Sequence, residues 1–181
     1  MSRLGFSIYP EHNSAKDDKR YIDRMVDLGA VRIFTCLLSA EGDTQAIFNH
    51  YKDVIGYART KGLEVIVDIA PSIFDKFGVE RGDLKLFYEM GATGIRLDEG
   101  FSAAENARLT MNPYGLSIEL NASTNDNIVG SIMAFKPNVE RLLTCHNFYP
   151  QKYTALGQTF FDETSKEMKQ YNMRVAAFVG S

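Results

Sequence analysis

The chain of 181 residues is 45% hydrophobic and carries a formal net charge of -3, which is enough for one domain with a buried core. This mild acidity, without a block of basic residues, argues against nucleic acid and anionic membrane surfaces as partners. The start, MSRLGFSIYPEH, lacks a basic region followed by a long apolar stretch, so we expect no signal peptide and a cytoplasmic protein. Cys36 and Cys145 are the two cysteines, expected as free thiols in a reducing compartment.

Short β-type runs alternate with amphipathic helical segments along the whole chain. Apolar residues recur at helical spacing in residues 47–58 and 160–171, where they predict two of the helices. Repeated units of this kind predict a mostly parallel sheet, either open and doubly wound or closed into a barrel. In chain order, the seven predicted strands are residues 4–9, 31–35, 65–69, 94–97, 116–120, 142–145 and 175–179.

The two faces of the predicted strands differ in character, and this difference separates the two kinds of sheet. In GIRLDEG, Ile95 and Leu97 oppose Arg96 and Asp98, because side chains alternate along a strand. The segments VRIF, VIVDIAP, LSIELNAS and LLTCHN show a similar alternation. Strands covered by helices on both faces are expected to be apolar on both. The pattern therefore predicts a (β/α)8 TIM barrel, in which the apolar strand face meets the helices and the polar face points inward.

About seven strands are predicted here, whereas eight close a barrel of this type. We therefore expect residues 1–181 to form one truncated barrel domain that lacks its last unit. The polar strand ends gather at the carboxyl-terminal mouth, where enzymes of this fold carry their chemistry.

Polar side chains at these strand ends make up the candidate site. Asp98 and Glu119 end neighbouring strands on the inward face, and they are the predicted catalytic residues. Two carboxylates held close together push their proton affinities apart, which yields one acid and one base or nucleophile, as glycoside hydrolysis requires. The alternative is that Arg32 and Arg96 neutralise these acids in a buried structural network. The predicted substrate-binding residues are Tyr9, Glu11, Asp68, Arg96, Asn121, His146, Asn147 and Tyr149, and Thr35 and Ser39 are further candidates at the mouth.

Other chemistries find less support in the strand ends. No lysine ends a strand on the inward face, which argues against a Schiff-base aldolase. The three histidines are scattered, so a multi-histidine metal site is not expected and no cofactor is predicted. His50 is expected to face solvent from a helix. A divalent-cation site remains an open alternative, with the ligands Asp68, Asp98, Glu119 and His146.

Six segments in register carry a family resemblance: LGFSIYPEH, RIFTCLLS, VIVDIAPSIF, GIRLDEGF, LSIELNAST and CHNFYP. In this order they resemble the bacterial 6-phospho-N-acetylmuramidase family of the MupG type. The resemblance implies a TIM barrel followed by a smaller cyclophilin-like β domain, which is absent from residues 1–181. It also implies intracellular hydrolysis of the 6-phosphorylated disaccharide MurNAc-GlcNAc to N-acetylmuramic acid 6-phosphate and N-acetylglucosamine, as part of cell-wall recycling.

The leading hypothesis is therefore a glycosidase for a phosphorylated amino-sugar disaccharide. One of Asp98 and Glu119 protonates the leaving oxygen, and the other acts as base or nucleophile. Arg96 binds the phosphate or tunes Asp98, and the residues expected to orient the sugars are Asn121, His146, Asn147 and Tyr149. The rival hypotheses are a metal-dependent sugar-phosphate isomerase or aldolase, and a non-catalytic module that binds sugar phosphates. No oligomeric state is predicted.

Overall fold

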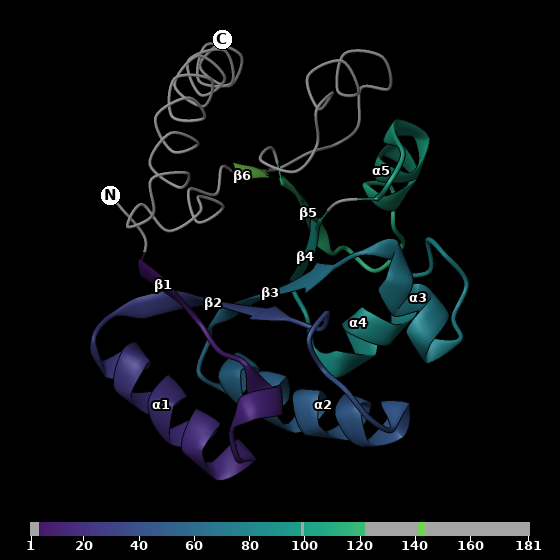
Figure 1. Cartoon of the computed structure of the whole chain (residues 1–181). Coiled ribbons are helices and arrows are strands. Elements are labelled where there is room, and N and C mark those ends of the chain that lie inside the picture. Colours follow the sequence, from purple (N-terminus) through teal and green to yellow (C-terminus); the bar gives the residue numbers. More distant parts are fainter. Residues whose placement is uncertain (1–3, 99, 122–140, 144–181) are drawn as a thin grey trace, which may run out of the picture.

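The computed structural model describes residues 4–98, 100–121 and 141–143. In this part of the chain, six parallel strands form one sheet in the order β1-β2-β3-β4-β5-β6, so that each strand pairs with its neighbours in sequence (Figure 1). The strands are β1 Leu4–Ser7, β2 Ala30–Cys36, β3 Glu64–Ile69, β4 Gly94–Leu97, β5 Ser117–Asn121 and β6 Arg141–Leu143.

Helices follow the strands, and three of them begin at a side chain that accepts a hydrogen bond from a free N–H group of the first turn. Ser14 accepts a hydrogen bond from the first turn of α1, Asp43 does so for α2, and Ser102 forms a capping box at α5. No helix among the described residues is long and apolar enough to cross a membrane. The helices are η1 Pro10–His12, α1 Ala15–Asp27, α2 Thr44–Thr60, α3 Pro71–Phe77, α4 Lys85–Met90 and α5 Ala103–Leu109.

The structure confirms the parallel α/β organisation and five of the predicted strands, with ends that shift by at most two residues. The prediction for residues 142–145 overlaps β6, and residues 175–179 lie outside the described residues. Closure of the barrel and the count of seven strands therefore stay predictions.

The outward face of the sheet packs against the helices in a single apolar core. Ile33, Val65 and Ile95 alternate with the polar inward positions, and they belong to the same buried cluster as Val54 and Ile55 of α2. Figure 1 shows α1 and α2 along one side of β1, β2 and β3. The helices thus cover one face of the central strands, and the site lies on the opposite face.

Gly94 lies at a tightly packed point of that inward face. It pairs with Ile66 on one side and Ser117 on the other. A Cβ atom at Gly94 would meet the Ser117 hydroxyl, and it would lie 2.7 Å from Cδ1 of Ile66 and 3.0 Å from the Ser117 carbonyl oxygen. Only glycine lets the three strands approach this closely.

We therefore expect Gly94→Ala to lower the free energy of unfolding by about 1–3 kcal/mol, the usual cost of overpacking. Gly56→Ala is the matched control, because Gly56 lies inside α2 and nothing lies within 4 Å of a Cβ added there. Alanine should stabilise that helix by about 0.5–1 kcal/mol. Urea denaturation of both variants measures the difference, and equal effects would contradict the close packing at Gly94.

Candidate active site

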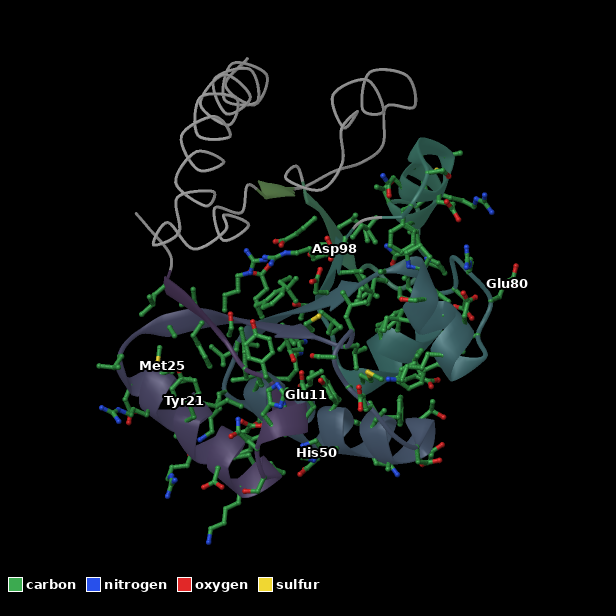
Figure 2. All side chains as sticks on the ribbon, viewed as in Figure 1. Glu11, Tyr21, Met25, His50, Glu80 and Asp98 are labelled. Carbon is green, nitrogen blue, oxygen red and sulfur yellow. The ribbon has the colours of Figure 1, made fainter. Side chains whose placement is uncertain are left out.

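A row of side chains crosses the inward face of the sheet near the carboxyl ends of its strands. Strand pairing places Cys36 of β2 beside Asp68 of β3, Asp68 beside Arg96 of β4, and Arg96 beside Glu119 of β5. Asp98 follows directly after β4, and Figure 2 shows it on the side of the sheet opposite α1 and α2. Three adjacent strands therefore bring three carboxylates to one end of the inward face.

Glu119 is the most enclosed of these carboxylates, with a side chain that is 2% exposed. Its Oε1 accepts a hydrogen bond from Nη2 of Arg32. Its Oε2 lies 3.3 Å from Nη2 and 3.4 Å from Nε of Arg96. Two guanidinium groups thus neutralise one buried carboxylate, an arrangement that compensates the cost of removing its charge from water.

Arg96 is held in place from three sides. Its guanidinium lies 4.2 Å from the centre of the Phe34 ring, within the range of a cation–π contact. It pairs with Glu119. Its positive charge also lowers the pKa of Asp68, although burial and the charge of Asp98 raise that pKa by more. Arg96 therefore links the buried ion pair to the acidic groups at the strand ends.

Among the described residues, Asp68 is the carboxyl group whose pKa is shifted most by its surroundings. Burial raises its pKa to about 7, and the negative charge of Asp98 adds to this effect. Its Oδ1 is buried, with no hydrogen-bond partner among the described residues. Asp98 is half-buried, and its backbone N–H donates to the Ile69 carbonyl at 2.9 Å. Near neutral pH, Asp68 is therefore protonated in part of the molecules.

Glu11 anchors a second polar cluster beside this pair. The Ser39 hydroxyl donates to its Oε1, and the Tyr51 hydroxyl lies 2.6 Å from its Oε2 and 2.9 Å from the Cys36 carbonyl oxygen. Burial favours the neutral form of Glu11, but the hydrogen bonds from Ser39 and Tyr51 outweigh it and lower the pKa. Glu11 is therefore ionised at neutral pH.

Cys36 joins the two clusters. It is a free cysteine, as predicted, and burial raises the pKa of its thiol to about 11. Strand pairing sets Cys36 beside Asp68, and the Cys36 carbonyl oxygen accepts a hydrogen bond from the Tyr51 hydroxyl.

A family model described as 6-phospho-N-acetylmuramidase, N-terminal, matches residues 4–181. The chain belongs to this family. No curated protein matches the sequence. The family match agrees with the resemblance carried by the six strand-end segments, and it covers all the residues of the two clusters.

Two solved structures are similar over nearly the whole of this family member. An uncharacterized B. cereus protein is 41% identical with a TM-score of 0.67, and the match covers 93% of this chain and 45% of that protein. A conserved Enterococcus faecalis protein of unknown function is 28% identical with the same TM-score of 0.67, covering 94% and 46%. The chain thus spans less than half the length of either protein.

More distant structures share the fold alone. The HpcH/HpaI aldolase of Desulfitobacterium hafniense is 11% identical with a TM-score of 0.59, and the match covers 94% of this chain and 75% of the aldolase. A phosphonopyruvate hydrolase, solved as a complex with oxalate and Mg++, is 15% identical, also with a TM-score of 0.59, covering 91% and 61%.

The predicted site residues divide between the two clusters and the rest of the chain. Asp68, Arg96, Asp98 and Glu119 lie together, and Glu11 lies next to them across Cys36. Tyr9 is 42% exposed at the start of η1. Asn121 ends β5, and only its backbone is described. His146, Asn147 and Tyr149 lie outside the described residues, so their roles stay predictions.

The side chains of Thr35 and His50 do not lie where the sequence predicts them. Thr35 is fully buried between inward-facing Phe34 and Cys36, so its side chain faces the helix layer and not the mouth. His50 is half-buried, and its Nε2 donates to the Pro10 carbonyl at 2.8 Å instead of facing solvent. Helical spacing could not reveal this contact, because η1 supplies it from 40 residues away.

The rival cation site stays a prediction, since His146 lies outside the described residues. Among the residues that are described, no three His, Cys, Asp or Glu side chains are grouped as metal ligands. Sequence reasoning also passed over Cys36 and Tyr51 as members of the site. Tyr51 falls within residues 47–58, for which the apolar spacing predicts only a helix, and it is also a core residue with 1% exposure.

Proposed function

We propose that this chain is the barrel part of a hydrolase that cleaves the 6-phosphorylated disaccharide MurNAc-GlcNAc. The products are N-acetylmuramic acid 6-phosphate and N-acetylglucosamine, and the reaction serves cytoplasmic recycling of the cell wall. The family supports the substrate class. The observation that carries the proposal is the acidic pair Asp68 and Asp98, in which one carboxyl group has a pKa of about 7 beside a second carboxylate.

Glycoside hydrolysis needs a proton for the leaving oxygen and a carboxylate for the other side of the reaction. In the proposed mechanism, Asp68 supplies the proton as the glycosidic C–O bond breaks. As a base, Asp98 takes a proton from the water that attacks the anomeric carbon. As a nucleophile, Asp98 instead bonds to the anomeric carbon, and water then breaks that bond. In both cases one proton of the water returns to Asp68, which restores the starting state.

Glu119 has a different proposed role from the one expected from its strand position. Both of its oxygens are engaged by Arg32 and Arg96, so direct chemistry would first require a guanidinium to withdraw. We assign Glu119 to positioning Arg96. Arg96, with a side chain that is 16% exposed, then tunes the acidic pair and presents positive charge towards the phosphorylated sugar.

The test is hydrolysis by the natural full-length protein between pH 5 and pH 9, with both products identified by mass spectrometry. We expect kcat to fall above about pH 7, because Asp68 then loses the proton that it must donate. A rate that keeps rising through pH 9 would contradict Asp68 as the acid. Failure to release N-acetylglucosamine at any pH would contradict the function itself.

A further inference from the structure

Phe34 is a large apolar side chain on the polar, inward face of the sheet, between the outward core positions Ile33 and Thr35. It is half-buried, but it belongs neither to the buried apolar cluster nor to the partly buried side chains that pack against that cluster. Among the described residues, its ring contacts no other aromatic ring. The ring instead faces the guanidinium of Arg96, 4.2 Å from the ring centre. Packing of the apolar core therefore does not explain a phenyl ring at this position.

The strand register sets the direction from which the ring supports the guanidinium. Phe34 pairs with Ile66, whereas Arg96 pairs with Asp68, two residues farther along β3. Phe34 thus starts from a position nearer the amino ends of the strands than Arg96 does. The ring therefore limits movement of the guanidinium towards the amino ends, away from the acidic groups of the site.

Glu119 holds a second edge of the same guanidinium and leaves one nitrogen available. Oε2 of Glu119 faces Nε and Nη2 of Arg96, at 3.4 Å and 3.3 Å. No described residue accepts a hydrogen bond from Nη1, although the side chain is only 16% exposed. A guanidinium that is fixed in place and still has donors to offer is well suited to bind phosphate oxygens.

Arg96 also has more positive charge to offer a ligand than Arg32 has. Arg32 lies between two carboxylates, because it pairs with Glu119 and has Oε2 of Glu64 at 3.9 Å. Arg96 shares Glu119 with Arg32, and its neighbour along the sheet is Asp68, which has a pKa of about 7 and is partly protonated near neutral pH. An anionic group is therefore attracted more strongly to Arg96.

We infer that Phe34 is a positioning residue that holds Nη1 of Arg96 ready for the phosphate group of the phosphorylated sugar, an inference that rests on the proposed function. Asp98, which acts at the anomeric carbon, follows Arg96 by two residues, about 7 Å of extended backbone. Neighbouring positions of one chain segment thus serve the phosphate and the reacting carbon of the same sugar. Phe34 thereby contributes to the preference for a phosphorylated substrate without touching it.

Phe34→Leu tests this role, because leucine remains apolar but has no ring to attract the guanidinium. The natural full-length protein is assayed at pH 6, where Asp68, with a pKa of about 7, is mostly protonated. We expect KM for the phosphorylated disaccharide to rise about 3- to 30-fold, the range of a cation–π contact. We expect kcat to stay nearly unchanged, because the phosphate is bound in both the ground state and the transition state. Phe34→Tyr keeps the ring and should retain the KM of the wild type.

Phe48→Leu is the matched control, because the Phe48 ring also faces a cation, Lys52, at 5.3 Å on α2. This change should leave KM and kcat unaltered. A fall in kcat without a rise in KM for Phe34→Leu, or an equal rise in KM for Phe34→Tyr, would overturn the positioning role.

Calorimetric titration with N-acetylmuramic acid 6-phosphate and with N-acetylmuramic acid separates the phosphate contact from contacts to the rest of the sugar. Phe34→Leu should weaken binding of the phosphorylated sugar by about the same factor as KM rises, and it should leave binding of the other sugar unaffected. Equal weakening for both sugars, or a wild type that binds both equally tightly, would contradict the phosphate contact.

A double substitution shows whether the ring acts through the guanidinium. In an Arg96→Gln background, Phe34→Leu should cause no further rise in KM, because the group that the ring positions is gone. An equal rise in both backgrounds would overturn the inference and leave the proposed function intact. A wild-type protein that does not cleave the disaccharide would instead refute the proposed function, and the calorimetric titration would still decide the phosphate contact.

Discussion

Asp98→Asn is expected to lower kcat of the full-length protein by roughly 10²–10⁴-fold, the range typical of a lost acid–base group. Asn keeps the size of the side chain but can neither accept the proton from water nor attack the anomeric carbon. Because Asp98 follows β4 and is tied to β3 through the Ile69 carbonyl, the backbone should be unaffected. KM should change little, since the lost interaction belongs to the transition state.

The same substitution should also change the pH dependence of the reaction. The negative charge of Asp98 is one of the causes that raise the pKa of Asp68. In Asp98→Asn that charge is gone, so the residual activity should decline at a lower pH than in the wild type. Asp27→Asn, at the exposed end of α1, is the matched control and should leave both kcat and the pH profile unchanged. Full activity in a folded Asp98→Asn protein would end the assignment.

Alternation along single strands predicted which side chains share the inward face, and that prediction needs no tertiary information. GIRLDEG alone placed Arg96 and Asp98 opposite the core residues Ile95 and Leu97, and Ile95 and Leu97 are indeed buried. The same rule shows why Thr35 failed as a site candidate. Inward-facing Phe34 forces its neighbour outward, and Cys36 becomes the last inward group of β2.

The partners of each charge could not be predicted in this way. Arg32 reaches Glu119 from 87 residues away, and the two belong to strands that do not pair with each other. The raised pKa of Asp68 likewise depends on burial and on Asp98 at the end of another strand. A strand pattern gives the face of a side chain, whereas the ionisation of that side chain depends on all the strands around it.

Glu119→Gln is expected to reduce the free energy of unfolding by about 3–5 kcal/mol, the usual cost of removing one partner from a buried ion pair. The change deletes the carboxylate charge that Arg32 and Arg96 share. Glu64 lies 3.9 Å from Arg32 and compensates one guanidinium only in part. Glu80→Gln is the control, because Figure 2 shows Glu80 pointing into solvent, and it should shift stability by less than about 0.5 kcal/mol.

Activity measurements on the same variant decide between the two roles of Glu119. If Glu119 positions Arg96, Glu119→Gln and Arg96→Gln should weaken catalysis to a similar extent, because both substitutions break the same contact of the Arg96 guanidinium. The coupling between the two substitutions in a double-mutant cycle should then be about 0.5–3 kcal/mol. If Glu119 acts directly on the substrate, Glu119→Gln should lower kcat far more than Arg96→Gln does. In that case Glu119, and not Asp68, would be the catalytic partner of Asp98. The buried position of Glu119, with both oxygens held by arginine, favours the first result.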